Sequence, residues 1–495
     1  MQPNKIETLG IGEIESRVQI AASPYQGNGE VNFSTLDGHG SGKAVLDPIS
    51  IADLLRNGFV YPPHSIYGDV KVATSGFDAN QDLYDHPRFQ WPFQSSMVSS
   101  RPAADSVDDR ALLATYHRLL CDAVLRCTGD MQSPWLLQSG GKDSTSMAIA
   151  AAEVSPRTTC LTYLGGPEEN EVASARLVAK KLGLRHETLT CDPGRAYDRY
   201  LAMVPRIPLL TADFASLSYA DLATEVDLRG GDGIIDALGS DAYFGLPVEL
   251  RKRMLLMLAR GLPLPSGVFG LGPIGRSFKF CYALGTLQMN SFERFYPGSR
   301  FTDAETDELL GRPIASRSRQ RLETFRENIA AADSWEARRQ ISVGILESAV
   351  YAKGMYAAEA LSLRLVYPYC DKRLRDWVFH EVPDDRLIGP GGVNKVLVRQ
   401  HIAQYFQELP YVTAKGSFRF DLCGLARQRF DQVHAFAVQT RALLPGASRW
   451  LEIHRDRLDN KYFASKFYLL AVILPWLHSR LHNARPLRVD ELPAS

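Results

Sequence analysis

The residue types and spacing that most clearly suggest chemistry occur in one short segment, residues 139–144, with the sequence SGGKDS. An apolar run, PWLLQ, precedes this segment, and a helical pattern, TSMAIAAAEV, follows it. Two glycines let the backbone approach an anion closely, the following helix presents its positive end, and serine hydroxyls add hydrogen-bond donors. We therefore interpret residues 139–144 as a phosphate-binding loop.

One acidic residue inside this loop, Asp143, suggests a metal ion. A carboxylate would repel phosphate unless a cation lay between them, so we interpret Asp143 as a magnesium ligand that acts through the bound phosphates. The loop differs from a Walker A loop, because Asp143 rather than Ser or Thr follows Lys142 and the upstream glycine is absent. A Gly-Gly turn with an aspartate helix cap is the purely structural alternative.

Alternating strand and helix patterns surround the loop and must position it. The strand pattern TTCLTYL, the helical pattern EVASARLVAKKLG and the short strand pattern HETLT follow in turn. Units of this kind build a parallel sheet with helices on both faces. Beyond about residue 250 helical patterns dominate, and the last of them is ASKFYLLAVILPWLHSRL. The sequence therefore predicts an α/β fold with a parallel sheet and a helical C-terminal half.

The N-terminal part of the chain has a different character. Up to about residue 105 it is rich in Gly, Ser, Asp and Pro, with β-like runs such as VQIAA and GDVKVAT and one helical pattern around ISIADLLRNGF. A polar stretch, SSRPAADSVDD, then leads into the helical pattern ALLATYHRLLCDAVLRC. We place a domain boundary there, with a small β-rich domain over residues 1–105 and the α/β domain over residues 106–495.

Charge and composition narrow the class of protein. The 495 residues carry 56 Lys and Arg and 56 Asp and Glu, so there is no net charge to attract nucleic acid or an anionic membrane. The first residues are charged where a signal peptide needs an apolar core, and no stretch approaches the roughly 20 apolar residues of a membrane span. The seven cysteines form no C-x-x-C pair, which indicates a reducing compartment and no structural zinc. We expect a soluble, cytoplasmic protein.

Several segments together resemble one known family. Residues 139–144 resemble the signature loop of the PP-loop enzymes, or N-type ATP pyrophosphatases, and later segments are similar to their asparagine synthetase branch, which includes β-lactam synthetases. Residues 236–245, DALGSDAYFG, resemble the second magnesium motif of that branch, and residues 413–416, TAKG, resemble its catalytic lysine loop. YPYCDKRLRDWVFHEVP and GGVNKVLVRQ are similar to two further elements. The matches keep the family's order over about residues 110 to 425.

The resemblance implies a PP-loop synthetase fold, ATP and Mg²⁺ as cofactors, and activation of a substrate carboxylate with release of AMP and pyrophosphate. It implies that Asp143 and Asp241 hold magnesium and that Lys415 stabilises charge in the transition state. The other residues that it places at the nucleotide are Leu137, Ser139, Gly140, Gly141, Lys142, Ser144, Asp236, Ala237 and Arg399. Taken alone, Asp241 could be a turn residue, Lys415 a surface lysine, and Lys395 with Arg399 a solvated helix face.

The chain departs from the family at its N-terminus. Glutamine-hydrolysing relatives begin with a nucleophilic cysteine, whereas here Met1 is followed by Gln2 and no cysteine precedes Cys121. We therefore expect no glutaminase activity. The N-terminal domain is predicted to be a truncated, non-catalytic Ntn-like remnant.

The chain also departs from the family where its members keep a proton acceptor. Leu238 occupies the position at which asparagine synthetases carry glutamate, β-lactam synthetases tyrosine, and peptide cyclases often histidine. A leucine takes no proton, so a general base for the amine must lie elsewhere. Substitutes offered by the sequence are Asp236, Tyr243, Tyr367 and Glu359, and Arg364 could pair with a substrate carboxylate.

The sequence therefore predicts an ATP-dependent, AMP-forming ligase that joins a small-molecule or peptide carboxylate to an amine, giving an amide or a lactam. Lactam formation and peptide cyclisation fit this pattern, and the chain could form a homodimer. Two alternatives stay open. One is a PP-loop enzyme that thiolates or modifies a nucleobase or tRNA, and the other is a degenerate nucleotide-binding scaffold.

Overall fold

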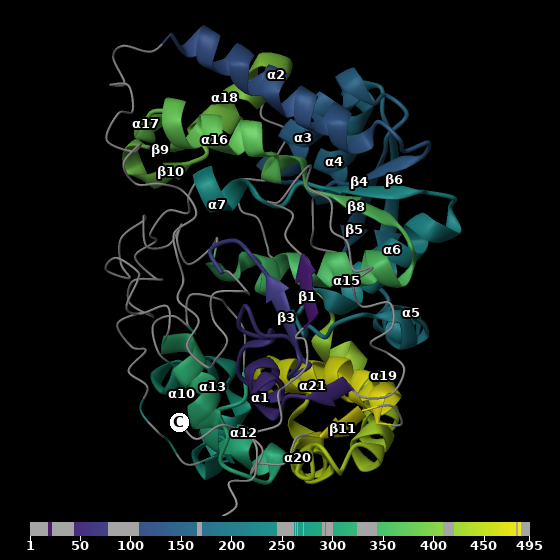
Figure 1. Cartoon of the computed structure of the whole chain (residues 1–495), viewed down its shortest axis with the longest axis vertical. Helices are drawn as coiled ribbons and strands as arrows, with labels where there is room; N and C mark the ends of the chain where they lie inside the picture. Colours follow the sequence, from purple (N-terminus) through teal and green to yellow (C-terminus); the bar gives the residue numbers. More distant parts are fainter. Residues whose placement is uncertain are drawn as a thin grey trace, which may run out of the picture.

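The structure is a computed structural model of the whole chain (Figure 1). It describes residues 18–21, 44–77, 108–165, 171–244, 262, 264, 266–270, 272–289, 293, 300–323, 344–408, 420–481 and 484–486. The proposed catalytic lysine, Lys415, lies outside the described residues, as does most of the predicted N-terminal domain.

Five parallel strands form the central sheet in the order β6-β5-β4-β7-β8. Their bounds are β4 (Pro134–Leu137), β5 (Thr159–Leu164), β6 (Arg185–Thr190), β7 (Gly233–Asp236) and β8 (Arg364–Val366). From β4 the chain builds outward through β5 and β6, and then returns to the opposite side of β4 for β7 and β8. The carboxyl ends of β4 and β7 therefore meet at a topological switch point, where open α/β sheets bind their ligands.

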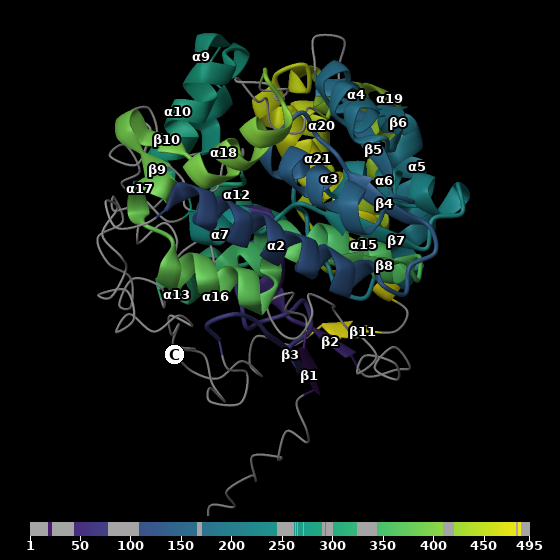
Figure 2. The same ribbon diagram turned by 90° about the horizontal axis from the view of Figure 1, so that it is seen from above.

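Helices cover both faces of this sheet (Figure 1). One face carries α2 (Asp109–Thr128), α3 (Lys142–Val154), α4 (Glu171–Leu182) and α18 (Val396–Tyr405). Figure 2 shows α2, α3 and α18 side by side on that face. The other face carries α6 (Ser216–Leu228) and α15 (Ala352–Ala360), with α5 (Pro193–Met203) packed on α6. The predicted α/β class, and each strand and helix predicted around the loop, are confirmed.

Three further helices, α7 (Ser240–Phe244), α16 (Lys372–Glu381) and α17 (Asp384–Leu387), lie in the upper half of Figure 1 near α2 and α18. The helices below the sheet in Figure 1 are α1 (Pro48–Asn57), α10 (Phe278–Gln288), α12 (Asp303–Leu310), α13 (Ala315–Glu323), α19 (Leu422–Gln439), α20 (Ala447–His454) and α21 (Lys461–Arg480). A short helix, α9 (Gly272–Arg276), contacts α10. The last helix, α21, is apolar around most of its circumference because α1, α10, α19 and α20 all pack against it. The helical C-terminal half is thus confirmed.

The described part of the N-terminal region is joined to this helical half. β1 (Val18–Ala21) pairs with β3 (Val70–Ala73), β2 (Ala44–Leu46) pairs with the C-terminal β11 (Ala484–Pro486), and α1 (Pro48–Asn57) is buried along its whole length. Arg56 of α1 forms ion pairs with Glu293 and Asp303. The predicted strands and helix are confirmed here. The boundary near residue 105 lies outside the described residues, so the division into domains stays a prediction.

All seven cysteines lie in described segments, and none forms a disulfide bond with another described residue. Among the described residues, no helix combines the length and the apolar character needed to cross a membrane.

Candidate active site

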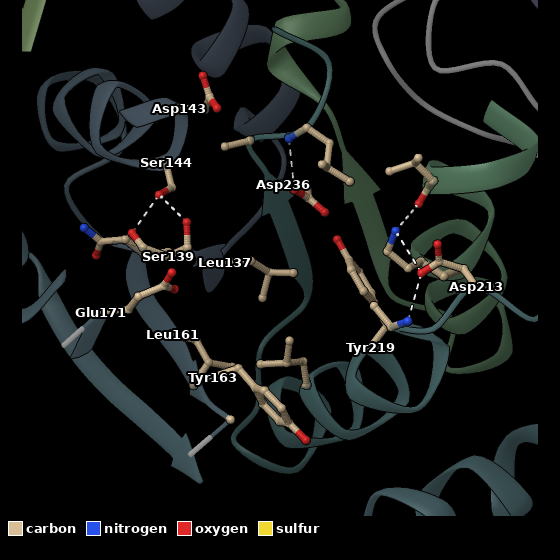
Figure 3. A pocket seen from close by; sticks show the side chains of 18 of the residues that line it. Leu137, Ser139, Asp143, Ser144, Leu161, Tyr163, Glu171, Asp213, Tyr219 and Asp236 are labelled. Atoms are coloured by element: carbon tan, nitrogen blue, oxygen red, sulfur yellow. Dashed lines mark hydrogen bonds and ion pairs between the residues drawn. The ribbon is translucent and has the colours of Figure 1, made fainter. Parts of the chain in front are cut away.

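A cavity of about 420 Å³ opens at the carboxyl edge of the sheet, between the ends of β4 and β7 (Figure 3). Leu137 and Asp236, the last residues of these two strands, are register partners, so the strand ends themselves form its floor. The described residues that line it are Leu137, Gln138, Ser139, Asp143, Ser144, Leu161, Tyr163, Gly165, Glu171, Asp213, Phe214, Ala215, Tyr219, Leu222, Asp236, Ala237, Leu238, Asp241, Val350 and Lys353. The topological switch point is therefore a cleft of the size that small-molecule sites have.

The phosphate-binding loop is held in shape by its own hydroxyl groups. The Ser144 hydroxyl donates to the backbone carbonyl of Ser139 at 2.8 Å, and the Gly141 N–H donates to Ser139 Oγ at 3.2 Å. Gly141 is the N-cap of α3 and has no side chain to make a capping bond, so no cap competes for the first-turn N–H groups. A Cβ on Gly140 would lie 3.0 Å from the Cα of Glu171, so glycine lets α4 begin beside the loop.

A second loop, after β7, directs another carboxylate toward the first. The Leu238 N–H donates to Asp236 Oδ1 at 3.0 Å, which closes a tight turn. Gly239 follows with φ 118°, and a Cβ there would lie 3.0 Å from the sulfur of Cys370. Because only glycine adopts this backbone shape without strain, the turn can pass this crowded point and bring Asp241 to the start of α7.

Lys395 joins the two loops. Its Nζ lies 2.7 Å from Asp143 Oδ2, 2.5 Å from Asp241 Oδ1 and 2.9 Å from Ser240 Oγ, and the residue is 2% exposed. Burial disfavours its charge, but attraction by the two carboxylates outweighs burial and raises the pKa of Lys395. Lys395 also has a left-handed backbone, φ 57°, a strained state that non-glycine residues keep mainly at functional sites. The alternative interpretation of Lys395 as part of a solvated helix face is wrong.

Asp143 and Asp241 fit a magnesium ion. They come from different loops, yet both present a carboxylate oxygen to the same positive charge, the ammonium group of Lys395. Carboxylate oxygens are the hard ligands that Mg²⁺ takes, usually one or two from the protein with the rest from phosphate and water. The structure therefore brings the two predicted metal ligands together, and their role as ligands stays a prediction.

Other cations gather beside the loop. Lys142 is half-buried, and burial followed by repulsion from Arg399 and Lys395 lowers its pKa. Arg399 is half-buried too, and its Nε donates to the backbone carbonyl of Asn394 at 2.9 Å. Three cationic side chains that repel one another in a small volume make a favourable place for an anionic ligand.

The structure places the predicted site residues in three groups. Those that line the cavity are Leu137, Ser139, Asp143, Ser144, Asp236, Ala237 and Asp241. Those that flank it from the loop, its helix or α18 are Gly140, Gly141, Lys142 and Arg399. Lys415 lies outside the described residues.

The residues suggested as proton acceptors occupy different environments in the structure. Asp236 lines the cavity, whereas Tyr367 is fully buried, with a pKa that burial raises, and Glu359 is exposed on α15. The side chain of Tyr243 lies outside the described parts. Arg364 begins β8 at the opposite edge of the sheet and forms an ion pair with Asp130 at 3.3 Å, so the suggestion that it meets a substrate carboxylate is wrong.

Sequence reasoning missed the wall opposite the phosphate-binding loop. Asp213, Tyr219 and Lys353 line that wall, and Figure 3 shows the Tyr219 ring reaching toward Asp236, while the Asp213 carboxylate accepts from the backbone N–H of Ala215. Lys353 Nζ donates to the Val350 carbonyl at 2.6 Å and lies 3.4 Å from Asp213 Oδ1. The buried Tyr219 hydroxyl has no hydrogen-bond partner among the described residues. We find no sequence motif around these three residues, so only the folded chain identifies them.

A parallel sheet with a phosphate-binding loop at its switch point defines an α/β nucleotide-binding class of protein. The family model for asparagine synthase matches residues 115–419, and the chain belongs to this family. It is a family of ATP-using ligases that form amide bonds. The resemblance found in the sequence is thereby confirmed.

Comparison with individual proteins adds little beyond the family. A search of curated proteins finds no match. Among solved structures the chain is similar to the NMN synthetase from Francisella tularensis, with 14% identity, coverage of 50% of this chain and 97% of that chain, and a TM-score of 0.22.

Proposed function

We propose that this protein adenylates a substrate carboxylate with ATP, releases pyrophosphate, and joins the activated acyl group to an amine as an amide or a lactam, with release of AMP. The observation that carries the proposal is the convergence of Asp143 and Asp241 on one cation beside the phosphate-binding loop. Two carboxylates and a lysine at a loop built for phosphate are the parts that phosphoryl and nucleotidyl transfer requires.

The cavity offers separate places for the parts of ATP. Leu161, Tyr163 and Leu222 line it together with Leu137, and they form an apolar wall beside the loop. A flat purine ring would lie against this wall, while the phosphates would lie at the N-terminus of α3 near Lys142 and Lys395. Magnesium held by Asp143 and Asp241 would supply charge compensation on the phosphate oxygens.

The chemistry then follows in two displacements. A carboxylate oxygen of the substrate attacks the α-phosphorus, the bond to the bridging oxygen breaks, and its electrons leave with pyrophosphate. Lys395 and Lys142 lie where they would stabilise the charge that develops on the phosphates, a role that the family resemblance also gives to Lys415. The amine then attacks the acyl carbon, AMP leaves, and the proton of the amine passes to a base, for which Asp236 is the candidate that lines the cavity.

The wall with Asp213, Tyr219 and Lys353 is our candidate for the acyl and amine substrates. A buried ammonium group and a free hydroxyl group would hold a carboxylate or carbonyl oxygen, and a nearby carboxylate would hold an amine. Leu238 leaves the adjacent surface apolar, which would suit a substrate with a hydrocarbon part. We therefore expect an amino acid or peptide derivative that carries both reacting groups.

The test is a nucleotide-product assay. The protein is incubated with ATP, Mg²⁺ and fractions of a pool of amino acids, peptides and carboxylic acids, with ammonia or glutamine added separately, and AMP, ADP and pyrophosphate are measured. We expect AMP and pyrophosphate in equal amounts, with a product lighter by one water than its precursors. ADP and phosphate as the products would contradict the proposal.

The same assay, with tRNA and a labelled sulfur donor added, separates the two alternatives. A thiolating enzyme would transfer sulfur to tRNA, but none of the seven cysteines lines the cavity. Incorporation of labelled sulfur into RNA would favour that alternative all the same. Nucleotide binding without cleavage in every fraction would favour a scaffold.

A further inference from the structure

A second cluster of reactive side chains lies at the far end of α3 from the phosphate-binding loop. His117 and Cys121 stand one turn apart on α2, and Glu153 stands on the last turn of α3. His117 Nε2 lies 2.9 Å from Glu153 Oε2 and 3.5 Å from Cys121 Sγ, and one ligand atom from each of the three residues lies within 4.8 Å of the others. None of the three lines the active-site cavity.

A chain of polar contacts connects this cluster to the phosphate-binding loop. It begins with His117 Nδ1, 3.0 Å from His401 Nε2, and continues from His401 Nδ1 to Ser146 Oγ at 2.9 Å. Ser146 Oγ lies 3.0 Å from Tyr116 Oη, which lies 3.2 Å from Tyr369 Oη. The chain ends where the Tyr369 hydroxyl donates to the backbone carbonyl of Asp143 at 3.2 Å. Four elements, α2, α3, α18 and the turn before α16, contribute to it.

The direction of donation along this chain follows from its last contact. A carbonyl oxygen only accepts, so Tyr369 donates its single hydroxyl proton to the loop and can only accept from its neighbours, the Tyr116 and Ser146 hydroxyls. When the single protons of Tyr116 and Ser146 are directed within this group of hydroxyls, Ser146 accepts from Nδ1–H of His401. His401 is completely buried, which disfavours a charged ring, so its Nε2 is an acceptor. The proton between the two imidazoles therefore belongs to Nδ1 of His117.

This assignment leaves Nε2 of His117 facing a carboxylate. A nitrogen lone pair and a carboxylate oxygen repel each other at 2.9 Å unless a proton or another cation lies between them. The Tyr405 hydroxyl, 3.5 Å from Nε2, can donate to the nitrogen but cannot neutralise Glu153. A proton shared by His117 and Glu153 would involve only these two residues, whereas a metal ion would also bind the sulfur of Cys121, which lies 3.5 Å from His117 Nε2.

The spacing of the three side chains suits a metal ion. In a tetrahedral zinc site, bonds of about 2.1 Å to nitrogen and about 2.3 Å to sulfur place the two ligand atoms roughly 3.6 Å apart. His117 Nε2 and Cys121 Sγ are 3.5 Å apart. His401, which accepts from the other nitrogen of His117, is the orienting partner that metal-bound histidines usually have. Glu153 is 56% exposed, so an ion could enter from solvent.

We propose that His117, Cys121 and Glu153 bind one divalent transition-metal ion, with Zn²⁺ as the preferred occupant, and that this ion clamps α2 to α3 behind the phosphate-binding loop. The mixed nitrogen, sulfur and oxygen donors favour zinc over magnesium or calcium. A site of this composition needs no C-x-x-C pair, the feature whose absence led us to expect no structural zinc. The proposal does not depend on the proposed ligase activity.

The first test measures zinc. The full chain is treated with a chelator, equilibrated with Zn²⁺, freed of excess metal and analysed for bound zinc per chain. Cys121→Ala removes one ligand, and Cys423→Ala is the matched control, because Cys423 is a half-buried free thiol outside the cluster whose sulfur contacts the Asp459 carbonyl. We expect one zinc more in the wild type and in Cys423→Ala than in Cys121→Ala. Equal zinc in all three proteins, or none in any, would overturn the proposal.

The second test identifies the ligands with Co²⁺. A cobalt–thiolate bond gives a charge-transfer absorption, which we expect in the wild type and in Cys423→Ala but not in Cys121→Ala. Glu153→Gln changes an exposed side chain and is expected to fold normally, yet to weaken Zn²⁺ binding at least tenfold. The proposal fails if the absorption is absent from the wild type, or if Glu153→Gln binds Zn²⁺ as tightly as the wild type does.

Discussion

The two walls of the cavity are built in different ways. The phosphate wall consists of two loops with recognisable motifs, joined by Lys395, which contacts both Asp143 and Asp241. The opposite wall consists of single side chains, Tyr219 on α6 and Lys353 on α15, that no motif surrounds. A phosphate-binding loop requires a particular backbone conformation and therefore particular consecutive residues. Recognition of the acyl or amine substrate requires only a few side chains at suitable positions, which can come from different helices. We therefore expect changes in the phosphate wall to lower the rate with every substrate, and changes in the opposite wall to alter which substrate is accepted.

The largest effect is expected for Asp143→Asn. The change keeps the shape of the loop but removes the charge that Lys395 and the predicted metal ion share. We expect AMP formation to fall about a thousandfold, since electrostatic stabilisation of the transition state is lost. Asp122→Asn, which breaks an exposed ion pair with Arg118 on α2 and does not touch the residues that line the cavity, is the control. Similar turnover in both variants would remove Asp143 from the mechanism.

Lys415→Ala should follow, with a loss of roughly a hundredfold in kcat if this lysine stabilises developing charge as the family resemblance implies. The measurement is steady-state AMP release at saturating ATP, together with the unfolding temperature. If the variant unfolds at a lower temperature but keeps the wild-type kcat, Lys415 is a structural residue.

Gly239→Ala tests whether the second loop depends on its backbone shape. An alanine at φ 118° is strained, and its Cβ would press on Cys370, so we expect a loss of about 2 kcal/mol in the free energy of unfolding. AMP formation should fall as well, because Asp241 would be displaced. Gly267→Ala, where no atom lies within 4 Å of the added Cβ, is the control. Urea denaturation measures the free energy of unfolding of both variants. Equal stability of Gly239→Ala and the wild type would show that the turn tolerates a side chain.

Lys353→Met tests the opposite wall. Methionine keeps most of the volume and removes the charge that lies near Asp213. We expect KM for the carboxylate substrate to rise about tenfold, as for the loss of one charge-assisted hydrogen bond, with the affinity for a non-hydrolysable ATP analogue unchanged. Weaker binding of the analogue would show that Lys353 serves the nucleotide, and the division between the two walls would fail.

The smallest effect is expected for Tyr219→Phe. This change removes only the hydroxyl that lacks a partner among the described residues, so stability should stay the same or rise slightly. KM for the acyl substrate should rise severalfold if that hydroxyl binds it. Tyr197→Phe removes another buried tyrosine hydroxyl, on α5 and away from the cavity, and should leave KM unchanged. Equal kinetics in the two variants would exclude a role for Tyr219.

Most of the α/β core could be predicted from the sequence. The strand β4, the loop after it and the helix α3 were each visible as a pattern, because apolar runs, glycine pairs and helical spacing act within a few residues. Asp143 was singled out by its chemistry, and Asp241 by the resemblance of its segment to a family motif. Lys395 was the opposite case, because spacing alone allowed a solvated position. Its burial and its left-handed backbone arise from packing between loops.

The sequence by itself determined the local elements, the order of strands and helices around the phosphate-binding loop, and the family. The tertiary structure decided which side chains share a cavity or a cluster. Lys395 and Asp143 are 252 positions apart, and Glu153 reaches His117 from another helix. The physical reason is range: dihedral preferences and hydrogen bonds within a turn are encoded in neighbouring residues, whereas contacts between distant segments depend on how all the apolar surfaces pack at once.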